Sequence, residues 1–109
     1  MARIKPERGA TLVIRNGGFE GVSYDLDESE ILIGRNPTTD ITLIDEGISR
    51  EHAIILFDAE HQAFVVEDLQ STNGTRVNGK RVRSTELTDR DKLQIGHTLF
   101  EFRSPEPAK

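Results

Sequence analysis

Residues 75–83 read Thr-Arg-Val-Asn-Gly-Lys-Arg-Val-Arg, and the Asn78-Gly79 pair within them is the strongest hairpin signal in the chain. An Asn-Gly pair readily takes the positive φ angles of a type I′ turn, whose twist matches that of the strands on either side. This stretch therefore predicts two short antiparallel strands, Thr75–Val77 and Lys80–Val82, joined by a two-residue turn.

Similar short segments of β-forming residues recur along the rest of the chain, with turn residues between them. They span Thr11–Arg15, Gly21–Leu26, Glu30–Gly34, Ile41–Leu43, Ala53–Asp58, Ala63–Asp68, Lys92–Ile95 and Thr98–Arg103. No segment of helical length shows a sustained apolar period of about 3.6 residues. We therefore expect an all-β fold, a sandwich of two antiparallel sheets with its loops gathered at the ends.

Length and composition predict one domain with short tails. The chain has 109 residues and no cysteine, and a domain of this size buries enough surface to fold without disulfides or a structural metal. Three of the four prolines lie near the two ends of the chain. We therefore expect the folded domain at residues 11–103, a flexible N-terminal tail at 1–10 and a C-terminal tail or linker at 104–109.

Charge and hydropathy limit the class of partner. The formal net charge is −5, so nucleic acid or an anionic membrane would be repelled at long range. The first ten residues are polar, and the longest apolar run, Ala53–Phe57, is too short to span a bilayer. We expect a cytoplasmic domain that binds neither nucleic acid nor membrane and is a monomer in isolation.

Three patterns resemble enzyme sites but lack part of what the chemistry requires. Gly74–Lys80 fits the start of a P-loop, yet Arg81 stands where a magnesium-binding Ser or Thr is needed, and the hairpin leaves no helix after the loop. Ser49 and His52 lack the second glycine of a nucleophile elbow. The three histidines lie in different segments, without metal-binding spacing. No catalytic residue, cofactor or metal site is therefore predicted.

The remaining pattern predicts a phosphate pocket built from three loops. The guanidinium of Arg35, just after a strand, suits paired charge-assisted hydrogen bonds to phosphate oxygens. Ser49 and Thr72 offer hydroxyl donors, and Arg50 offers more donors. The amide of Asn73 has both a donor and an acceptor for the main chain of an extended peptide. Each residue alone is typical of an ordinary turn or strand end, but together they predict a site for a phosphorylated peptide.

Four short blocks, taken in order, resemble the signature of the forkhead-associated (FHA) domain family. They are Gly34-Arg35, Ser49-Arg50-Glu51-His52, Ser71-Thr72-Asn73-Gly74-Thr75 and Val77-Asn78-Gly79, and the resemblance runs from Thr11 to Phe102. It implies a β-sandwich of about eleven strands that binds phosphothreonine peptides through loops at one end. The ligand would be a threonine-phosphorylated protein or peptide, either in the same chain or in a partner.

The resemblance also implies a role for each polar residue of the pocket. Arg35, Ser49 and Thr72 would contact the phosphate, and Arg50 would add to that contact through its main chain or its side chain. Asn73 would hold the backbone of the peptide. The expected function is thus a phosphothreonine-dependent binding module in signalling, part of a larger protein and not an enzyme.

Three further matched residues, Gly34, His52 and Gly74, correspond to positions that shape the loops without touching the ligand. One departure is the Gly96-His97 turn, where the family often has Gly-Asp. The resemblance implies that this turn lies away from the phosphate-binding blocks, so that the change affects the local turn alone.

Two interpretations stay open beside this one. A phosphate-independent scaffold or oligomerisation domain of the same fold is the alternative function. The basic cluster Arg76, Lys80, Arg81 and Arg83 is expected to be a solvated hairpin, although it could also favour acidic residues beside the phosphothreonine.

Overall fold

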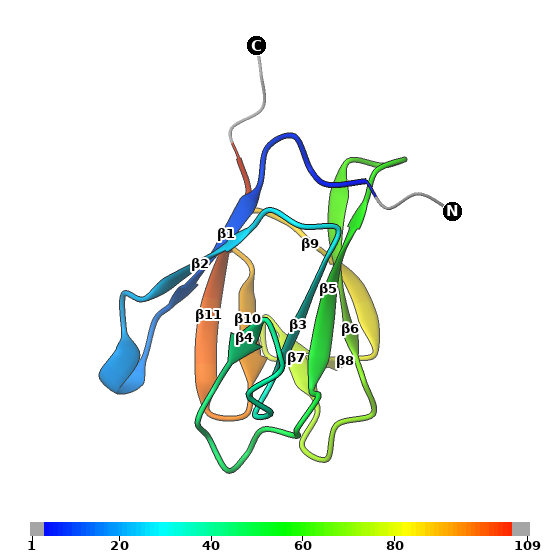
Figure 1. The fold of residues 1–109 in the computed structure, drawn as a ribbon. Coiled ribbons are helices and arrows are strands. Elements are labelled where there is room, and N and C mark those ends of the chain that lie inside the picture. The colour runs from blue at the N-terminus through cyan, green and yellow to red at the C-terminus, as the bar shows by residue number, and fades with distance from the viewer. Residues whose placement is uncertain (1–3, 106–109) are drawn as a thin grey trace.

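A computed structural model describes residues 4–105 as two β-sheets packed face to face (Figure 1). The eleven strands in this part of the chain are β1 (Ala10–Ile14), β2 (Ser23–Leu26), β3 (Glu30–Gly34), β4 (Ile41–Thr42), β5 (Ala53–Asp58), β6 (Ala63–Asp68), β7 (Thr75–Val77), β8 (Lys80–Val82), β9 (Ser84–Leu87), β10 (Lys92–Ile95) and β11 (Thr98–Arg103). One sheet has the order β2-β1-β11-β10-β7-β8 and the other β4-β3-β5-β6-β9. Neighbouring strands run antiparallel, apart from the parallel pair β3 and β4. The predicted all-β sandwich is confirmed.

The core lies between the two sheets and is filled by alternate residues of the strands. In β1, Leu12 and Ile14 are buried, whereas Val13 lies on the outer face. The rings of Phe64 in β6 and Phe102 in β11 meet with their centroids 5.7 Å apart and so join the sheets. Burying an aromatic or large aliphatic side chain stabilises a fold by about 1.5–3 kcal/mol, which makes this layer the main support for the loops at its end.

The predicted hairpin at residues 75–83 is confirmed as β7 and β8. Asn78 and Gly79 take φ angles of 52° and 84°, both in the left-handed region that a type I′ turn needs. The side-chain amide of Asn78 donates to Asp91, and its amide oxygen accepts from the main-chain N–H of Lys92, both across 2.9 Å. The tip of the hairpin is therefore tied to the start of β10.

Strand β9 is absent from the sequence-based prediction. Of its four residues, only Leu87 is buried, so there is no alternation of apolar side chains to detect. It pairs with β6 from Phe64 opposite Leu87 to Glu67 opposite Ser84. The strand is thus formed by pairing with its neighbour in the sheet, and its sequence alone carries little signal.

The first and last strands mark where the sandwich begins and ends, and the predicted division into domain and tails stays a prediction. Strand β1 begins at Ala10 and β11 ends at Arg103, and Pro6 is buried. Residues 1–3 and 106–109 of the predicted tails lie outside the described residues. The helical element in residues 4–105 is a 3-10 turn at Gly17–Phe19, and no helix in this range is long and apolar enough to cross a membrane.

Four connections gather at the lower end of the sandwich in Figure 1. They are the β3–β4 loop, the β4–β5 loop, the β6–β7 loop and the β10–β11 turn. The chain enters β1 and leaves β11 at the opposite end. The residues predicted to bind the phosphopeptide therefore all come from connections at one end of the molecule, whereas the Asn78-Gly79 turn lies at the start of β10, away from that end.

Candidate functional site

A pocket of about 170 Å³ lies between these loops. Its lining consists of Arg35, Glu46, Gly47, Ile48, Ser49, Thr72 and Asn73. The fold thus brings together four of the five predicted ligand-binding residues, Arg35, Ser49, Thr72 and Asn73, which come from three separate loops.

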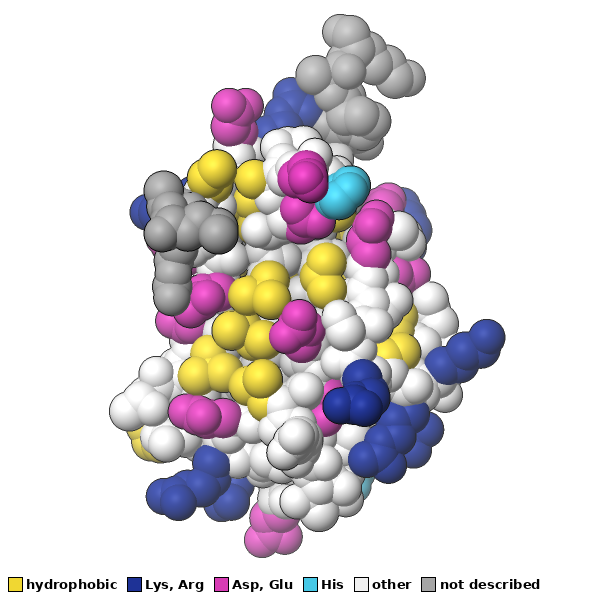
Figure 2. Space-filling model, turned by 90° about the vertical axis from the view of Figure 1, so that its right-hand side faces the viewer, with side chains coloured by type: hydrophobic (Ala, Val, Ile, Leu, Met, Phe, Trp, Pro, Cys, Tyr) yellow, Lys and Arg dark blue, Asp and Glu magenta, His cyan; other side chains and the backbone are white. Residues whose placement is uncertain are grey.

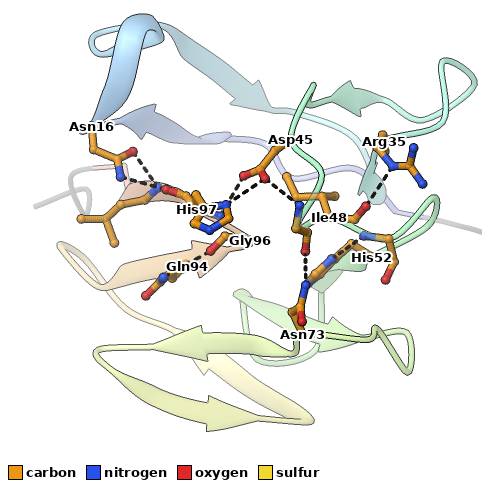
Figure 3. Close-up of polar contacts among 12 residues, drawn as sticks. Asn16, Arg35, Asp45, Ile48, His52, Asn73, Gln94, Gly96 and His97 are labelled. Atoms are coloured by element: carbon orange, nitrogen blue, oxygen red, sulfur yellow. Dashed lines mark hydrogen bonds and ion pairs between the residues drawn. The ribbon is translucent and has the colours of Figure 1, made fainter.

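Arg35 follows β3 directly and is held by the β4–β5 loop. Its Nε donates to the carbonyl oxygen of Ile48 across 3.1 Å, and its main-chain N–H donates to the carbonyl oxygen of Ser49 at the same distance (Figure 3). Within residues 4–105 the guanidinium forms no ion pair. The bond through Nε orients the side chain and leaves its two terminal amino groups free for an anion.

Ser49 and Thr72 meet across the pocket. The main-chain N–H of Thr72 donates to the hydroxyl oxygen of Ser49 across 3.1 Å. Because this oxygen accepts that bond, the hydroxyl hydrogen of Ser49 remains available to a ligand. Thr72 itself is exposed, so two hydroxyl donors lie on the same side as the guanidinium of Arg35.

Asn73 is fixed by the β4–β5 loop. Its side-chain nitrogen donates to the carbonyl oxygen of Gly47 across 2.9 Å (Figure 3). This contact sets the orientation of the exposed amide and leaves its oxygen free to accept from the main-chain N–H of a peptide.

His52 is fully buried and links two of the loops. Its Nδ1 accepts from the main-chain N–H of Ser49 across 3.1 Å, and its Nε2 lies 2.8 Å from the carbonyl oxygen of Gly74. A main-chain N–H can only donate and a carbonyl can only accept, so the ring is neutral with its proton on Nε2. Both ring nitrogens are engaged, and neither faces the hydroxyl of Ser49, as a serine hydrolase would require.

Two glycines leave space that a side chain would fill. A Cβ on Gly34 would lie 2.1 Å from the carbonyl oxygen of Arg50, and a Cβ on Gly74 would lie 2.5 Å from Nε of Arg81. Gly74 also has a φ of +84°, in the left-handed region that side chains disfavour. Lack of space thus requires glycine at Gly34, the end of β3, and the positive φ angle favours it at Gly74 in the β6–β7 loop.

Asp68 ends β6 and organises the loop that follows. Its carboxylate accepts hydrogen bonds from the main-chain N–H and the hydroxyl of Ser71 and from the hydroxyl of Thr75. The hydroxyl oxygen of Ser71 in turn accepts from the N–H of Gly74 across 2.9 Å. Burial acts to raise the pKa of Asp68, but the bonds from Ser71 and Thr75 outweigh it, and the pKa lies below its ordinary value.

Asp45 connects the β4–β5 loop to the β10–β11 turn. Its carboxylate accepts from the N–H of Gly47 and the N–H of His97, both across 2.8 Å, and lies 3.0 Å from Nδ1 of His97 (Figure 3). Burial acts to raise the pKa of Asp45, whereas the bonds from His97 and Gly47 lower it below its ordinary value. The expectation that the Gly96-His97 turn lies away from the phosphate-binding blocks is therefore wrong, since His97 supports the loop that carries Ser49.

Arg50 stands apart from the other predicted ligand-binding residues. Its side chain is exposed and does not line the pocket, and its carbonyl oxygen accepts from the N–H of Asn36 across 3.1 Å. Its part in phosphate binding stays a prediction.

A second hollow, of about 250 Å³, lies on the other side of the β4–β5 loop. Asp45 and His97 line it, and Phe19 and Ile44 stand at its edge with exposed fractions of 66% and 92%. Exposed large apolar side chains beside a binding loop offer contact area to a ligand. The hollow therefore extends the surface that a bound peptide could cover.

Asp45, Asp68 and His97 were not predicted from the sequence. The signals that could have found the two acids are local, namely the Asp-x-Gly turn at Asp45 and the Asp68-x-x-Ser71 spacing, both typical of side chains that bond to nearby main-chain N–H groups. The contact of His97 with Asp45 joins residues 52 positions apart, and no local signal marks it.

Comparison with known proteins identifies the family. The FHA domain model matches residues 31–96. The chain is 41% identical over 97 residues to the glycogen accumulation regulator GarA of Mycobacterium tuberculosis, which covers 89% of this chain and 59% of GarA. It is 38% identical over 97 residues to the oxoglutarate dehydrogenase inhibitor of Corynebacterium jeikeium, covering 89% and 66%. The chain thus spans about three fifths of the length of GarA.

The structure is likewise similar to a solved structure from a study of phosphothreonine-dependent FHA domain interactions. The TM-score is 0.82 and the sequence identity 35%, with 91% of this chain and 99% of that chain covered. The pocket geometry, the family match and this likeness agree, and the chain belongs to the FHA domain family, whose domains bind phosphothreonine peptides.

Proposed function

We propose that the pocket formed by Arg35, Ser49 and Thr72 binds the phosphate of phosphothreonine, and that Asn73 binds the peptide main chain. The observation that carries the proposal is the convergence of free donors. The terminal amino groups of Arg35 and the hydroxyl hydrogen of Ser49 are left over after the hydrogen bonds that position them. Arg50 adds donors from the rim as the peptide binds.

The expected affinity suits reversible signalling. About three or four charge-assisted hydrogen bonds at roughly 1.5–3 kcal/mol each are offset by several kcal/mol for association and for ordering of the peptide. At the favourable end of both ranges, four bonds of about 3 kcal/mol less about 4 kcal/mol for association leave near −8 kcal/mol, which corresponds to a micromolar Kd.

The wider role that we propose is a non-catalytic regulatory module of a larger protein. The names of the two relatives, a regulator and an inhibitor, support a binding role. The net charge of −5 supports a protein partner over nucleic acid or an anionic membrane. A cytoplasmic location and a monomeric state of the isolated domain stay predictions.

Calorimetric titration with a library of phosphothreonine peptides and their unphosphorylated counterparts tests the proposal. The domain should bind the phosphorylated set alone, and Arg35→Ala should abolish binding with a nearly unchanged Tm, because an exposed Arg contributes little to stability. The matched control is Arg90→Ala, which removes an exposed arginine from the β9–β10 connection. Equal binding of both peptide sets would refute the proposal.

One observation favours a phosphate-independent scaffold as the second candidate. The outer face of the sheet that contains β5 and β6 carries a patch of half-buried aliphatic side chains flanked by carboxylates, and Figure 2 shows it as yellow among magenta. The cross-strand pairs are Leu32 with Ile54 and Leu56 with Val65, and the flanking acids are Glu30, Glu67 and Glu86. Partner binding that survives Arg35→Ala and is lost on Ile54→Glu would support the scaffold.

A further inference from the structure

A basic groove lies on the far side of the loop that carries Thr72. We call it the Arg81–Arg83 groove; it has a volume of about 520 Å³ and is lined by Asp68, Gln70, Ser71, Arg81, Val82 and Arg83. Thr72 belongs to the phosphate pocket, whereas Gln70 and Ser71 belong to the groove. The two sites therefore share one loop, and Lys and Arg side chains gather at the lower right of Figure 2.

Arg81 is held directly against this loop. A Cβ on Gly74 would come within 2.5 Å of Nε and 2.9 Å of Cζ of Arg81. The guanidinium thus occupies the space that the absent side chain of Gly74 leaves. This placement brings the guanidinium of Arg81, an exposed residue of β8, against the loop that carries Thr72.

No side chain within residues 4–105 pairs with the two arginines of the groove. Neither Arg81 nor Arg83 forms a side-chain hydrogen bond or an ion pair with any residue of the range 4–105. Asp68 is the acid in the lining, but its oxygens accept from Ser71 and Thr75 and its side chain is only 12% exposed. The two guanidinium groups are consequently left without a partner in this range, because the one carboxylate of the groove already accepts hydrogen bonds from Ser71 and Thr75.

The groups left for a ligand are the two guanidinium groups, which only donate, and the amide of Gln70, which can donate and accept. The hydroxyl of Ser71 donates to Asp68 and accepts from Gly74, so it is not available. The exposed amide of Gln70 and the two guanidinium forks remain, and a guanidinium pairs with carboxylate or phosphate in the same bidentate geometry. The groove therefore suits an anion.

We propose that the Arg81–Arg83 groove binds a second anionic group, a carboxylate or a phosphate, on the same peptide whose phosphothreonine occupies the pocket of Arg35 and Ser49. The inference rests on the proposed function, because the phosphothreonine positions the peptide on the shared loop. An extended peptide advances about 3.3 Å per residue. The second group consequently lies within a few residues of the phosphothreonine.

Calorimetry with a set of phosphothreonine peptides tests this proposal. In each peptide one flanking position, up to four residues before or after the phosphothreonine, carries Ala, Glu or phosphoserine. At one position or two adjacent ones, an anion should raise the affinity about three- to ten-fold over Ala, because it can pair with both guanidinium groups at an exposed site. Arg83→Gln should remove the gain, and so should Arg81→Gln. Arg83→Gln is the decisive variant, because Arg81 also packs on Gly74.

The matched controls are Arg76→Gln and Lys80→Gln, which remove the same charge from the same hairpin but do not line the groove. If both Glu and phosphoserine raise the affinity, the groove recognises negative charge in general. If phosphoserine alone raises it, the groove recognises phosphate. Both results support the proposal. It is overturned if no flanking anion raises the affinity, if the gain persists in Arg83→Gln, or if the controls lose it equally. Failure of the Ala-flanked phosphothreonine peptide to bind would instead refute the proposed function.

Discussion

The Nε2 of His52 lies 2.8 Å from the carbonyl oxygen of Gly74, 22 residues further along the chain. The other ring nitrogen accepts from the N–H of Ser49. One buried side chain therefore sets the spacing between the loop that supplies Ser49 and the loop that supplies Thr72. The geometry of the phosphate pocket depends on a residue that does not line it.

His52→Leu should lower the free energy of unfolding by roughly 2–4 kcal/mol, because it leaves a main-chain N–H and a buried carbonyl without partners. Binding of a phosphothreonine peptide should weaken as well, since Ser49 and Thr72 lose their common support. Urea unfolding and calorimetry measure the two effects. His61→Leu serves as the control, because the His61 side chain is 68% exposed; equal effects of both variants would contradict this role.

Gly34→Ala should destabilise the domain by about 1–3 kcal/mol, the usual cost of overpacking. The added Cβ would lie 2.1 Å from the carbonyl oxygen of Arg50 and would push apart the segments that carry Arg35 and Arg50. Peptide affinity should fall with the Tm. Gly18→Ala adds the same methyl group in open space, so a Tm that falls equally there would show that packing at Gly34 is not the cause.

Peptide affinity should decrease as the pH falls through about 6, because a phosphate monoester loses its second negative charge there. The free donors of Arg35 and Ser49 then face a weaker acceptor. Calorimetry between pH 7.5 and 5 measures the change, and a thermal melt at each pH checks that the domain remains folded. A flat affinity profile over this range would argue against a phosphate-centred site.

The stability of the domain should fall at lower pH than this. The pKa values of Asp45 and Asp68 are lowered in the folded state, so their contribution is present above the ordinary carboxyl pKa of about 4 and is lost as the pH falls through the lowered value. Thermal melts from pH 7 to 2 should show this loss below about pH 4. Asp68→Asn should lower the Tm at pH 7 and flatten its acid dependence, whereas Asp25→Asn, at an exposed position of β2, should change neither.

Ile44→Ser should weaken peptides with an apolar residue near the phosphothreonine by about three- to ten-fold, because it removes apolar contact area worth roughly 25 cal/mol per Å². Ile44 is 92% exposed, so the Tm should stay the same. Ile4→Ser removes another exposed isoleucine, outside the binding loops. An unchanged affinity in Ile44→Ser would show that peptides do not reach the second hollow.

Local signals account for the parts of the fold and the site that the sequence predicts. Asn78-Gly79 determines its hairpin within four residues, whereas the expectation that Arg35, Ser49 and Thr72 meet at one end of a sandwich rests on the order of the motif blocks and on the family resemblance. The family resemblance adds the roles of these residues, which single turns do not reveal.

Features set by contacts between separate segments were missed. The strand at Ile41–Leu43 was predicted, but the parallel pairing of β4 with β3 through Ile33 opposite Ile41 was not, and β9 has one buried apolar residue to mark it. The support of the β4–β5 loop by His97 depends on a 52-residue separation that leaves no pattern in either segment. Each of these features depends on which segments lie next to one another in the folded sandwich.

The pairing of Thr11 with Arg103 brings the two ends of the domain together, opposite the loops that hold Arg35 and Thr72 (Figure 1). The longest dimension of the molecule is 41 Å. An extended chain covers at most about 3.3–3.6 Å per residue, so a flanking segment that spans this whole length to bring its own threonine to the pocket needs roughly twelve residues. Phosphorylation at a shorter tether length would create a ligand for a neighbouring copy. The length of the flanking segment, and not the pocket, would then decide whether its phosphothreonine binds within the same molecule or to a neighbouring one.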